Sequence, residues 1–440
     1  MDRWSVAVAG FVVGVALFAN PALAEDPLGA VPDIAAAPEY TVTPPRDFAD
    51  VKLAAAGSVS SQSVAVNPKN PNVFVAAYAN QGTCWVRTST NAGRTWAAAK
   101  KLPMPPDKQQ YCGTYDAAPA VLWAPDGSRI YAAYAYTYTI PPDSYSEIGV
   151  VVSSSTNQGA TWSVPVIALK YAESEAFASV RLATPLRATD AQWVYLVSES
   201  YWHVKHSFDF VRSSDRGKTW SAKQTLDTFY STYDGYDTIP SIAGGPGGEV
   251  LVAWGNFDYD PEDFHIAVTR STTYGSSFSP PTVAVPNAYG DTAIAFGNSG
   301  VAHLVYEDSW NHGGVSYTYS TKAPRTAWAM PIALNDQPAQ DYRWPALFVT
   351  ACGSNASVLH VVWSDDRIQS GHHNVYYTRK VAKTGESWSS NLRVSGQELP
   401  YAVAAIAAGS GTALGVWGPR SFASGLPAWA SRIAPGVNCP

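Results

Sequence analysis

One eight-residue turn motif, which we call the repeat turn, constrains the fold of this chain more than any other feature. Its clearest copy is Ser213–Trp220, which reads S-S-D-R-G-K-T-W. We expect Asp215 to accept hydrogen bonds from amides two residues ahead, and Thr219 to tie the turn shut. Gly217 can adopt the positive φ that a tight turn requires, and Trp220 supplies a large apolar anchor for the next strand.

The repeat turn recurs at nearly regular intervals. Ser89–Trp96 and Ser155–Trp162 are clear copies, and Ser271–Phe278, Ser320–Trp328 and Lys383–Trp388 are weaker ones. The aromatic residues that end the six copies are 66, 58, 58, 50 and 60 residues apart. A period of this size, filled by short alternating strands, predicts a radial array of small sheets.

These copies resemble the Asp-box repeat of sialidases and related β-propellers. The resemblance covers nearly all of the chain beyond residue 48. It implies an all-β propeller built from four-stranded blades. It is less specific for chemistry, because one fold carries many functions.

The strand pattern predicts seven blades, with six as the alternative. Seven first strands are expected to begin at Val64, Pro119, Val180, Pro240, Ala293, Pro345 and Val403. Only six fourth strands follow a repeat turn, but Asp50–Ala55 resembles those strands and precedes the first blade. We therefore expect this N-terminal strand to complete the last blade and close the ring, which removes free sheet edges.

The N-terminal region predicts export. Residues 1–24 combine Arg3, the apolar run Val6–Ala19 and the small-residue sequence Ala22-Leu23-Ala24, as in a secretory signal peptide. Residues 25–47 are rich in Pro and Ala and are expected to be a linker, and 48–440 to form one propeller. We expect a secreted protein, extracellular or periplasmic.

Four cysteines in an exported chain favour two disulfides. Cys84 and Cys112 flank the first repeat turn and form the natural local pair, which leaves Cys352 with Cys439. Sequence alone allows three pairings.

Charge limits the partners of this chain. The formal net charge is −6, and no Lys/Arg run is present, which argues against nucleic acid or an anionic membrane as partner. No second apolar stretch is long enough to span a membrane. We expect the protein to be a monomer.

The two rims of the predicted ring differ. The turn rim carries the repeat turns and the short turns between first and second strands, at 67–71, 125–128, 244–248 and 297–300. The loop rim carries longer connections rich in charged and aromatic residues: Tyr134–Ile148, Glu199–His206, Asn256–His265, Glu307–His312 and Asp365–His373. Long decorated loops usually carry function, so we expect the site on the loop rim.

Carboxylates occupy two recurring positions on the loop rim. Asp116, Asp237, Asp291 and Asp341 precede first strands, twice as D-x-x-P, where they serve either catalysis or the capping of strand amides. Other acids lie just beyond the second strands, where we expect them to leave the packed region and face the central funnel. The candidate catalytic acids at these positions are Asp116, Glu199, Asp237, Asp308, Asp341 and Asp365.

Cationic and aromatic residues on the same rim suit an acidic glycan. Arg343, Arg367 and Arg420 can grip a carboxylate or sulfate, unless neighbouring acids neutralise them. Flat apolar faces for sugar rings are offered by Tyr342, Trp344, Trp310 and Tyr236, although packing will claim part of this set.

No cofactor is expected, with calcium as the alternative. Asp258, Asp260 and Glu262 could gather oxygen ligands, but the central glycine and terminal glutamate of a helix-loop-helix calcium site are missing. The sequence contains no C-x-x-C spacing, which argues against a zinc site. His303 and His360 occupy equivalent second-strand positions and are expected to pack between blades.

The sequence favours a glycoside hydrolase. The resemblance to sialidases implies a Tyr–Glu nucleophile, an Asp acid/base and an arginine triad, but sialidases are six-bladed and carry R-I-P ahead of the first repeat turn. Here no arginine lies between Arg46 and Arg87. Another glycan specificity is therefore expected. The alternatives are a non-catalytic binding or assembly propeller, and a polysaccharide lyase using Tyr342, Arg343 and His372.

Overall fold

The computed structural model describes residues 50–433 except 55–58, 113–117, 141–144, 172–175, 203–204, 231–238, 258–263, 309–313, 322, 338, 340–341, 353–355, 383–386, 396–401, 410–411 and 420–426. The chain divides into two compact units, 1–43 and 44–440, and all described residues belong to the second. Within these residues, no helix has the length and apolar character needed to cross a membrane.

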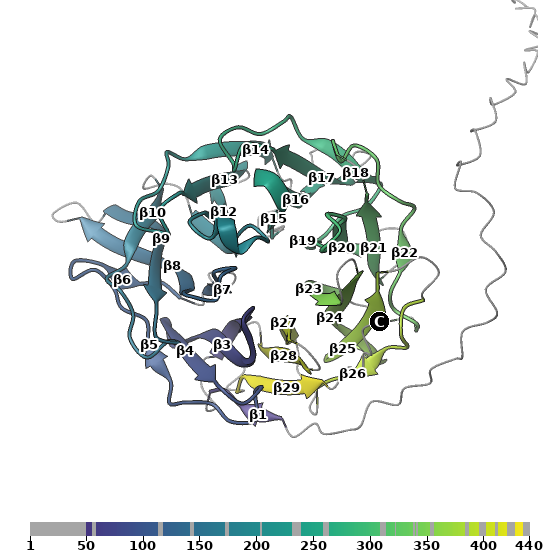
Figure 1. The fold of residues 1–440 in the computed structure, drawn as a ribbon, viewed down its shortest axis with the longest axis horizontal. Helices are drawn as coiled ribbons and strands as arrows, with labels where there is room; N and C mark the ends of the chain where they lie inside the picture. The colour runs from purple at the N-terminus through teal and green to yellow at the C-terminus, as the bar shows by residue number, and fades with distance from the viewer. Residues whose placement is uncertain are drawn as a thin grey trace, which may run out of the picture. The chain divides into compact units, whose positions relative to one another are not determined.

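The described residues form seven antiparallel sheets arranged around one axis, a seven-bladed β-propeller (Figure 1). Blade 1 holds β2 (Val59–Asn67), β3 (Asn70–Asn80), β4 (Thr83–Ser89) and β5 (Lys100–Lys101). Blade 2 holds β7 (Ala120–Trp123), β8 (Ile130–Ile140), β9 (Tyr145–Ser155) and β10 (Val166–Tyr171), with β6 (Gln109–Gln110) paired to β8. Blade 3 holds β11 (Ala176–Ala183), β12 (Val194–Trp202), β13 (Lys205–Ser213) and β14 (Gln224–Tyr230).

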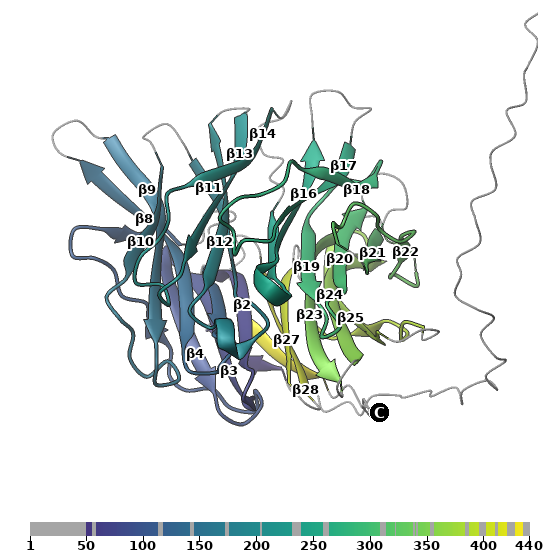
Figure 2. The same ribbon diagram turned by 45° about the horizontal axis from the view of Figure 1, so that its top comes forward.

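The remaining blades repeat this order, and Figure 2 shows their strands running between the two rims. Blade 4 holds β15 (Ser241–Gly244), β16 (Val250–Phe257), β17 (Phe264–Ser271) and β18 (Thr282–Pro286). Blade 5 holds β19 (Thr292–Phe296), β20 (Ala302–Asp308), β21 (Gly314–Ser320) and β22 (Ile332–Ala333). Blade 6 holds β23 (Tyr342–Cys352), β24 (Ala356–Gln369), β25 (His372–Val381) and β26 (Leu392–Arg393), and blade 7 holds β27 (Ala402–Gly409), β28 (Thr412–Pro419) and β29 (Trp429–Ile433).

The N-terminal strand β1 (Val51–Lys52) completes blade 7 and closes the ring. It pairs antiparallel with β29, with Val51 opposite Ala430. Arg87 of blade 1 donates from Nη1 to the carbonyl oxygens of Lys52 and Leu53, at 3.1 and 2.9 Å. The predicted closure by an N-terminal strand is confirmed, and the six-bladed alternative is wrong.

The repeat turn at Ser213–Trp220 is held by a single carboxylate. Asp215 Oδ1 accepts hydrogen bonds from the amides of Lys218 and Thr219, at 3.0 and 2.9 Å. The hydroxyl of Thr219 donates to Asp215 Oδ2 at 2.6 Å, so it does tie the turn shut. Gly217 has the expected positive φ of 79°.

The prediction that Asp215 binds amides two residues ahead is wrong. Arg216 and Gly217 both have positive φ, which turns the amides three and four residues ahead back toward the carboxylate. The bond across two residues belongs to Ser213, whose Oγ accepts from the amide of Asp215 at 3.3 Å. The same Oγ accepts from the amide of Gly217 at 2.8 Å.

Repeat turns also join each blade to the one before it. Tyr274 of the blade 4 turn stacks on Trp193 of blade 3, with ring centroids 4.8 Å apart. Arg212 of blade 3 donates from Nη1 to the carbonyl oxygens of Thr273 and Tyr274, at 3.1 and 3.0 Å. Across the closure, Arg432 of blade 7 donates from Nε to the carbonyl of Ala92 at 2.8 Å. These contacts fix the spacing of blades at the turn rim.

Large side chains of the second strands fill the space between blades. Six aromatic residues of these strands are at most 3% exposed: Tyr78, Tyr134, Trp254, Tyr306, Trp363 and Trp417. His303 and His360 are also buried, and each pairs its Nδ1 with a tyrosine hydroxyl at 2.8 Å, those of Tyr317 and Tyr377. Their predicted burial is confirmed, and each tyrosine belongs to the same blade as its histidine.

A disulfide joins Cys84 to Cys112, with Cα atoms 5.5 Å apart, as predicted. It ties the chain after blade 1 back to β4. Cys439 lies outside the described residues, so its pairing with Cys352 stays a prediction.

The turn geometry predicts unequal effects of two substitutions at position 215. Asp215→Ala removes the acceptor of the Lys218 and Thr219 amides and should lower the free energy of unfolding by about 1–2 kcal/mol. Asp215→Asn should cost less than about 0.5 kcal/mol, because Asn91 and Asn157 already accept the equivalent amides at 2.9 and 2.8 Å. Urea unfolding of both variants checks this. Equal losses would contradict the role assigned to the carboxylate oxygen.

The two buried histidines predict a loss of stability in acid. Burial lowers the pKa of His303 to about 4 and that of His360 to about 3, below the ordinary value of 6.5. Below pH 6.5 the unfolded chain binds protons that the folded chain rejects, so the free energy of unfolding falls as pH falls. Between pH 6.5 and 5 we expect the free energy of unfolding to fall by about 2 kcal/mol per histidine.

Urea unfolding between pH 7 and 5 measures this slope. The matched variant with His303→Gln and His360→Gln should be less stable at pH 7 but less sensitive to acid. A wild-type stability that stays constant over this range would show that the histidines accept protons in the folded state.

Candidate functional site

The first strands of all seven blades lie around the ring axis (Figure 1). They line a cavity, which we call the axial cavity. Its volume is about 270 Å³. Most of its wall consists of small or branched apolar side chains, because inner strands converge there and leave little room. A few polar and aromatic groups interrupt this wall: Gln62, Ser63, Arg181, Ser241, Asp291, Thr292, Trp344 and Phe348.

Asp291 connects two blades at the wall of the axial cavity. It immediately precedes β19 of blade 5, and its Oδ1 accepts the amide of Ile239, just before β15 of blade 4, at 2.9 Å. Beside it, the hydroxyls of Thr292 and Ser241 are 2.8 Å apart. Asp291 therefore caps a strand amide, as the sequence suggested, but this amide belongs to blade 4 and not to its own blade 5. The carboxylate remains 9% exposed.

Arg181 brings a cation to the same wall. It lies in β11 of blade 3 and donates from Nη1 to the carbonyl of Val180 at 2.9 Å. The sequence analysis did not predict this residue, because Arg181 lies within a strand and the site was expected on loops. The available signal was a charged residue in an otherwise apolar first strand, V-R-L-A.

Trp344 lines the axial cavity because the backbone of β23 is distorted. Its φ is +53°, which is rare for a bulky residue and further disfavoured before Pro345. The pairing of β23 with β24 shifts register between Arg343 and Ala346 at the same place. Backbone strain of this kind is retained where the surrounding structure enforces it, often at functional sites.

The acids at the ends of the second strands do not leave the packed region, so this part of the prediction is wrong. Their side chains are at most 4% exposed: Glu199, Glu307, Asp308, Asp365 and Asp366. The reason is that β12, β20 and β24 continue to or past these positions. Glu199 Oε1, for example, lies 2.9 Å from His206 Nδ1, and His206 stacks on Phe229.

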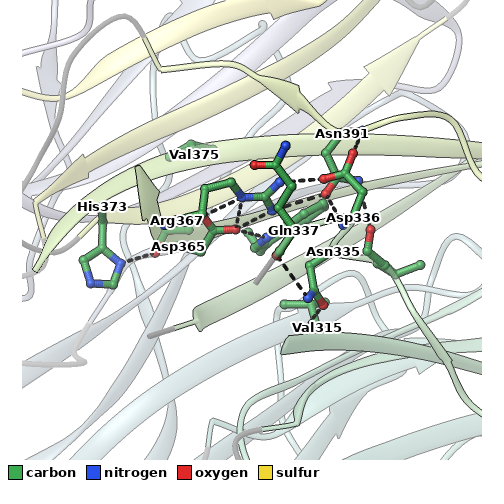
Figure 3. A network of polar contacts seen from close by, with 12 residues as sticks. Val315, Asn335, Asp336, Gln337, Asp365, Arg367, His373, Val375 and Asn391 are labelled. Atoms are coloured by element: carbon green, nitrogen blue, oxygen red, sulfur yellow. Dashed lines mark hydrogen bonds and ion pairs between the residues drawn. The ribbon is translucent and has the colours of Figure 1, made fainter. Parts of the chain in front are cut away.

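Asp365 and Arg367 form a buried ion pair at the junction of blades 5 and 6 (Figure 3). Arg367 Nη2 donates to Asp365 Oδ2 at 2.6 Å, and Nε donates to Oδ1 at 2.9 Å. Trp363 Nε1 donates to Oδ2 at 2.8 Å. The carboxylate is 0% exposed and already accepts several donors, which suits a structural role better than attack on a substrate.

The same arginine reaches across the blade boundary. Its Nη1 donates to Asp336 Oδ1 at 2.7 Å and its Nη2 to Asn391 Oδ1 at 3.2 Å. Its guanidinium also lies 3.9 Å from the centre of the Tyr376 ring. Burial alone would lower the pKa of Arg367, but the hydrogen bonds and charge of Asp365 outweigh burial and raise it. Neighbouring acids therefore neutralise this arginine.

The structure does not describe the side chains of the other sequence candidates. For Tyr342 and Arg343 only the backbone, in β23, is described. The candidates outside the described residues are Asp116, Asp237, Asp341, Arg420, Trp310 and Tyr236 for the site, and Asp258, Asp260 and Glu262 for calcium. Within the part of the chain that the structure describes, no group of three or more His, Cys, Asp or Glu could hold a metal ion.

No protein family model and no curated protein matches this sequence. Among solved structures, the chain is similar to the NanB sialidase from Streptococcus pneumoniae at 10% identity, covering 88% of this chain and 94% of that one, with a TM-score of 0.49. It is similar to an α-L-arabinofuranosidase from Fusarium graminearum at 13% identity, covering 78% and 97%, with a TM-score of 0.48. An α-L-arabinanase from Penicillium chrysogenum gives 13% identity, 73% and 94% coverage, and a TM-score of 0.47. Similarity at this level carries no conclusion about substrate or reaction.

The ion pair predicts that Asp365 acts on stability. Asp365→Asn should lower the free energy of unfolding by about 3–5 kcal/mol, because it leaves the buried Arg367 charge without its carboxylate. The matched control is Asp336→Asn, at the solvent-exposed end of the network, which should cost no more than about 1 kcal/mol. Urea unfolding measures both. Unchanged stability in Asp365→Asn would reopen a catalytic role for this acid.

Proposed function

We propose that the protein binds an acidic glycan in the axial cavity and hydrolyses one of its glycosidic bonds. The observation that carries this proposal is the convergence of Arg181, Asp291 and Trp344, from three different blades, on one cavity. A guanidinium group suits a carboxylate or sulfate on a sugar, and an indole face suits the sugar ring. The carboxylate of Asp291 adds an acceptor for sugar hydroxyls or a group for acid/base chemistry.

Hydrolysis requires more than binding. Most glycosidases use two carboxyl groups that flank the scissile bond. Asp116 and Asp237 belong to D-x-x-P segments whose described residues Pro119 and Ile239 line the axial cavity. From this sequence relation we infer that one of the two acids acts together with Asp291.

Export is part of the proposal. Residues 1–24 have the pattern of a secretory signal peptide. The Cys84–Cys112 disulfide suits an oxidising compartment outside the cytoplasm. A protein delivered there meets structural and secreted glycans.

The second candidate function is glycan binding without catalysis. It is favoured by one observation: among the described residues that line the axial cavity, Asp291 is the only carboxylate. The lyase alternative has less support, because its candidate base His372 is exposed at the start of β25 and does not line the cavity.

A glycan screen with matched variants tests the proposal. The purified protein is assayed for binding and for release of reducing ends on uronate-containing, sulfated, sialylated and neutral glycans. Arg181→Met should weaken binding of an acidic glycan about tenfold to a hundredfold, the equivalent of losing a charge-assisted hydrogen bond. Arg216→Met, which removes a cation that pairs with Asp126 far from the cavity lining, should leave binding unchanged.

Catalysis is tested separately from binding. Asp116→Asn, Asp237→Asn and Asp291→Asn are compared one at a time, and loss of turnover with binding retained would identify the acids. Binding to wild type without turnover on any glycan would favour the second candidate. An absence of glycan binding, or equal binding in Arg181→Met, would overturn the assignment of the axial cavity.

A further inference from the structure

A second cavity lies between blades 4 and 5, away from the axial cavity, and we call it the inter-blade groove. Its volume is about 420 Å³. Blade 4 contributes Arg270, Phe278 and Ser279, and blade 5 contributes Arg325 and Thr326. The groove is rich in hydroxyl side chains, and both charged residues that line it are arginines.

One carboxylate serves both arginines. Glu249 Oε1 accepts from Arg270 Nε at 2.7 Å and from Arg325 Nε at 3.1 Å. Glu249 Oε2 accepts from Arg325 Nη2 at 3.3 Å. Two positive charges therefore share one negative charge, and this half-buried cluster keeps a net charge of about +1.

Among the described residues, all three guanidinium nitrogens of Arg325 donate hydrogen bonds, whereas only Nε of Arg270 does. Arg325 is 4% exposed and also donates to the carbonyl oxygens of Ser320 and Gly300, at 2.7 and 2.6 Å. Arg270 uses Nε for Glu249, and no described residue accepts a hydrogen bond from its Nη1 or Nη2. With 21% of its side chain exposed, its remaining donors can reach the groove.

The corresponding arginine of blade 3, Arg212, shows why Arg270 keeps unused donors. Arg212 precedes the repeat turn of blade 3 as Arg270 precedes that of blade 4. Arg212 Nη1 donates to two carbonyl oxygens of the next repeat turn. The next turn after Arg270 is the divergent copy S-T-K-A-P-R-T-A-W, in which Arg325 binds Glu249 and donates to the carbonyl of Ser320, the first residue of its own turn. Divergence of the fifth turn therefore leaves the fork of Arg270 available.

We propose that the inter-blade groove is a second binding site, which takes an anionic group through Arg270. A planar guanidinium fork binds two oxygens of a sulfate, phosphate or carboxylate, and neighbouring hydroxyls can donate further hydrogen bonds. An anion here also neutralises the excess charge of the Glu249 cluster. The site is independent of the axial cavity and of the reaction proposed for it.

Thermal unfolding of the full protein in simple anions tests the proposal. Midpoints are measured in sodium sulfate, phosphate and acetate against sodium chloride at equal ionic strength, because a ligand of the folded state raises the midpoint. Sulfate and phosphate also stabilise proteins generally, so each shift is compared between variants. Arg270→Gln should lose the anion-specific part of the shift, a weakening of binding of at least about tenfold.

A second pair of variants leaves the Arg270–Glu249 contact intact. Thr326 is exposed in the groove, so Thr326→Glu places a competing carboxylate beside the fork, and Thr326→Gln is the neutral control. Thr326→Glu should lose the anion-specific shift, and Thr326→Gln should keep it. Which of the three anions gives the largest shift identifies the ligand chemistry. Equal shifts in wild type, Thr326→Glu and Thr326→Gln would overturn the proposal.

Discussion

The structure depends on contacts that join each blade to the preceding one. A four-stranded sheet buries little on its own, so stability comes from the faces and turns shared between neighbours. The repeat turn contributes to both. Its closing aromatic residue packs against the previous blade, as Phe278 does against Phe210. Its backbone carbonyls accept hydrogen bonds from the previous blade, as Tyr274 does from Arg212. The pairing of β1 with β29 likewise joins the first and last parts of the ring, because it brings the N-terminal strand into blade 7.

Ring geometry then decides where chemistry can occur. Seven inner strands converge on the axis, and small side chains dominate where they meet, so the few large or polar groups there stand out. Arg181, Asp291 and Trp344 are such groups. In contrast, the loop-rim ends of the second strands remain inside the packing, where Asp365 forms a buried ion pair with Arg367.

Departures from the repeat carry as much information as its copies. Glu249 and Arg325 replace the usual inter-blade contacts at the fifth turn, and Arg270 consequently keeps donors that its counterpart Arg212 uses. At Trp344, which lines the axial cavity, a bulge and a positive φ break the regular first strand. Both local irregularities coincide with cavities.

The sequence by itself determined the all-β fold, the seven blades, the closing strand, the Cys84–Cys112 disulfide and the burial of His303 and His360, because each follows from a repeated local pattern. It did not determine which charged residues reach the axial cavity. Arg181 was missed and Asp365 was overvalued, since one residue more or less of strand decides whether a side chain faces a cavity or a neighbouring blade. That choice depends on how seven sheets meet around an axis, which only the tertiary structure fixes.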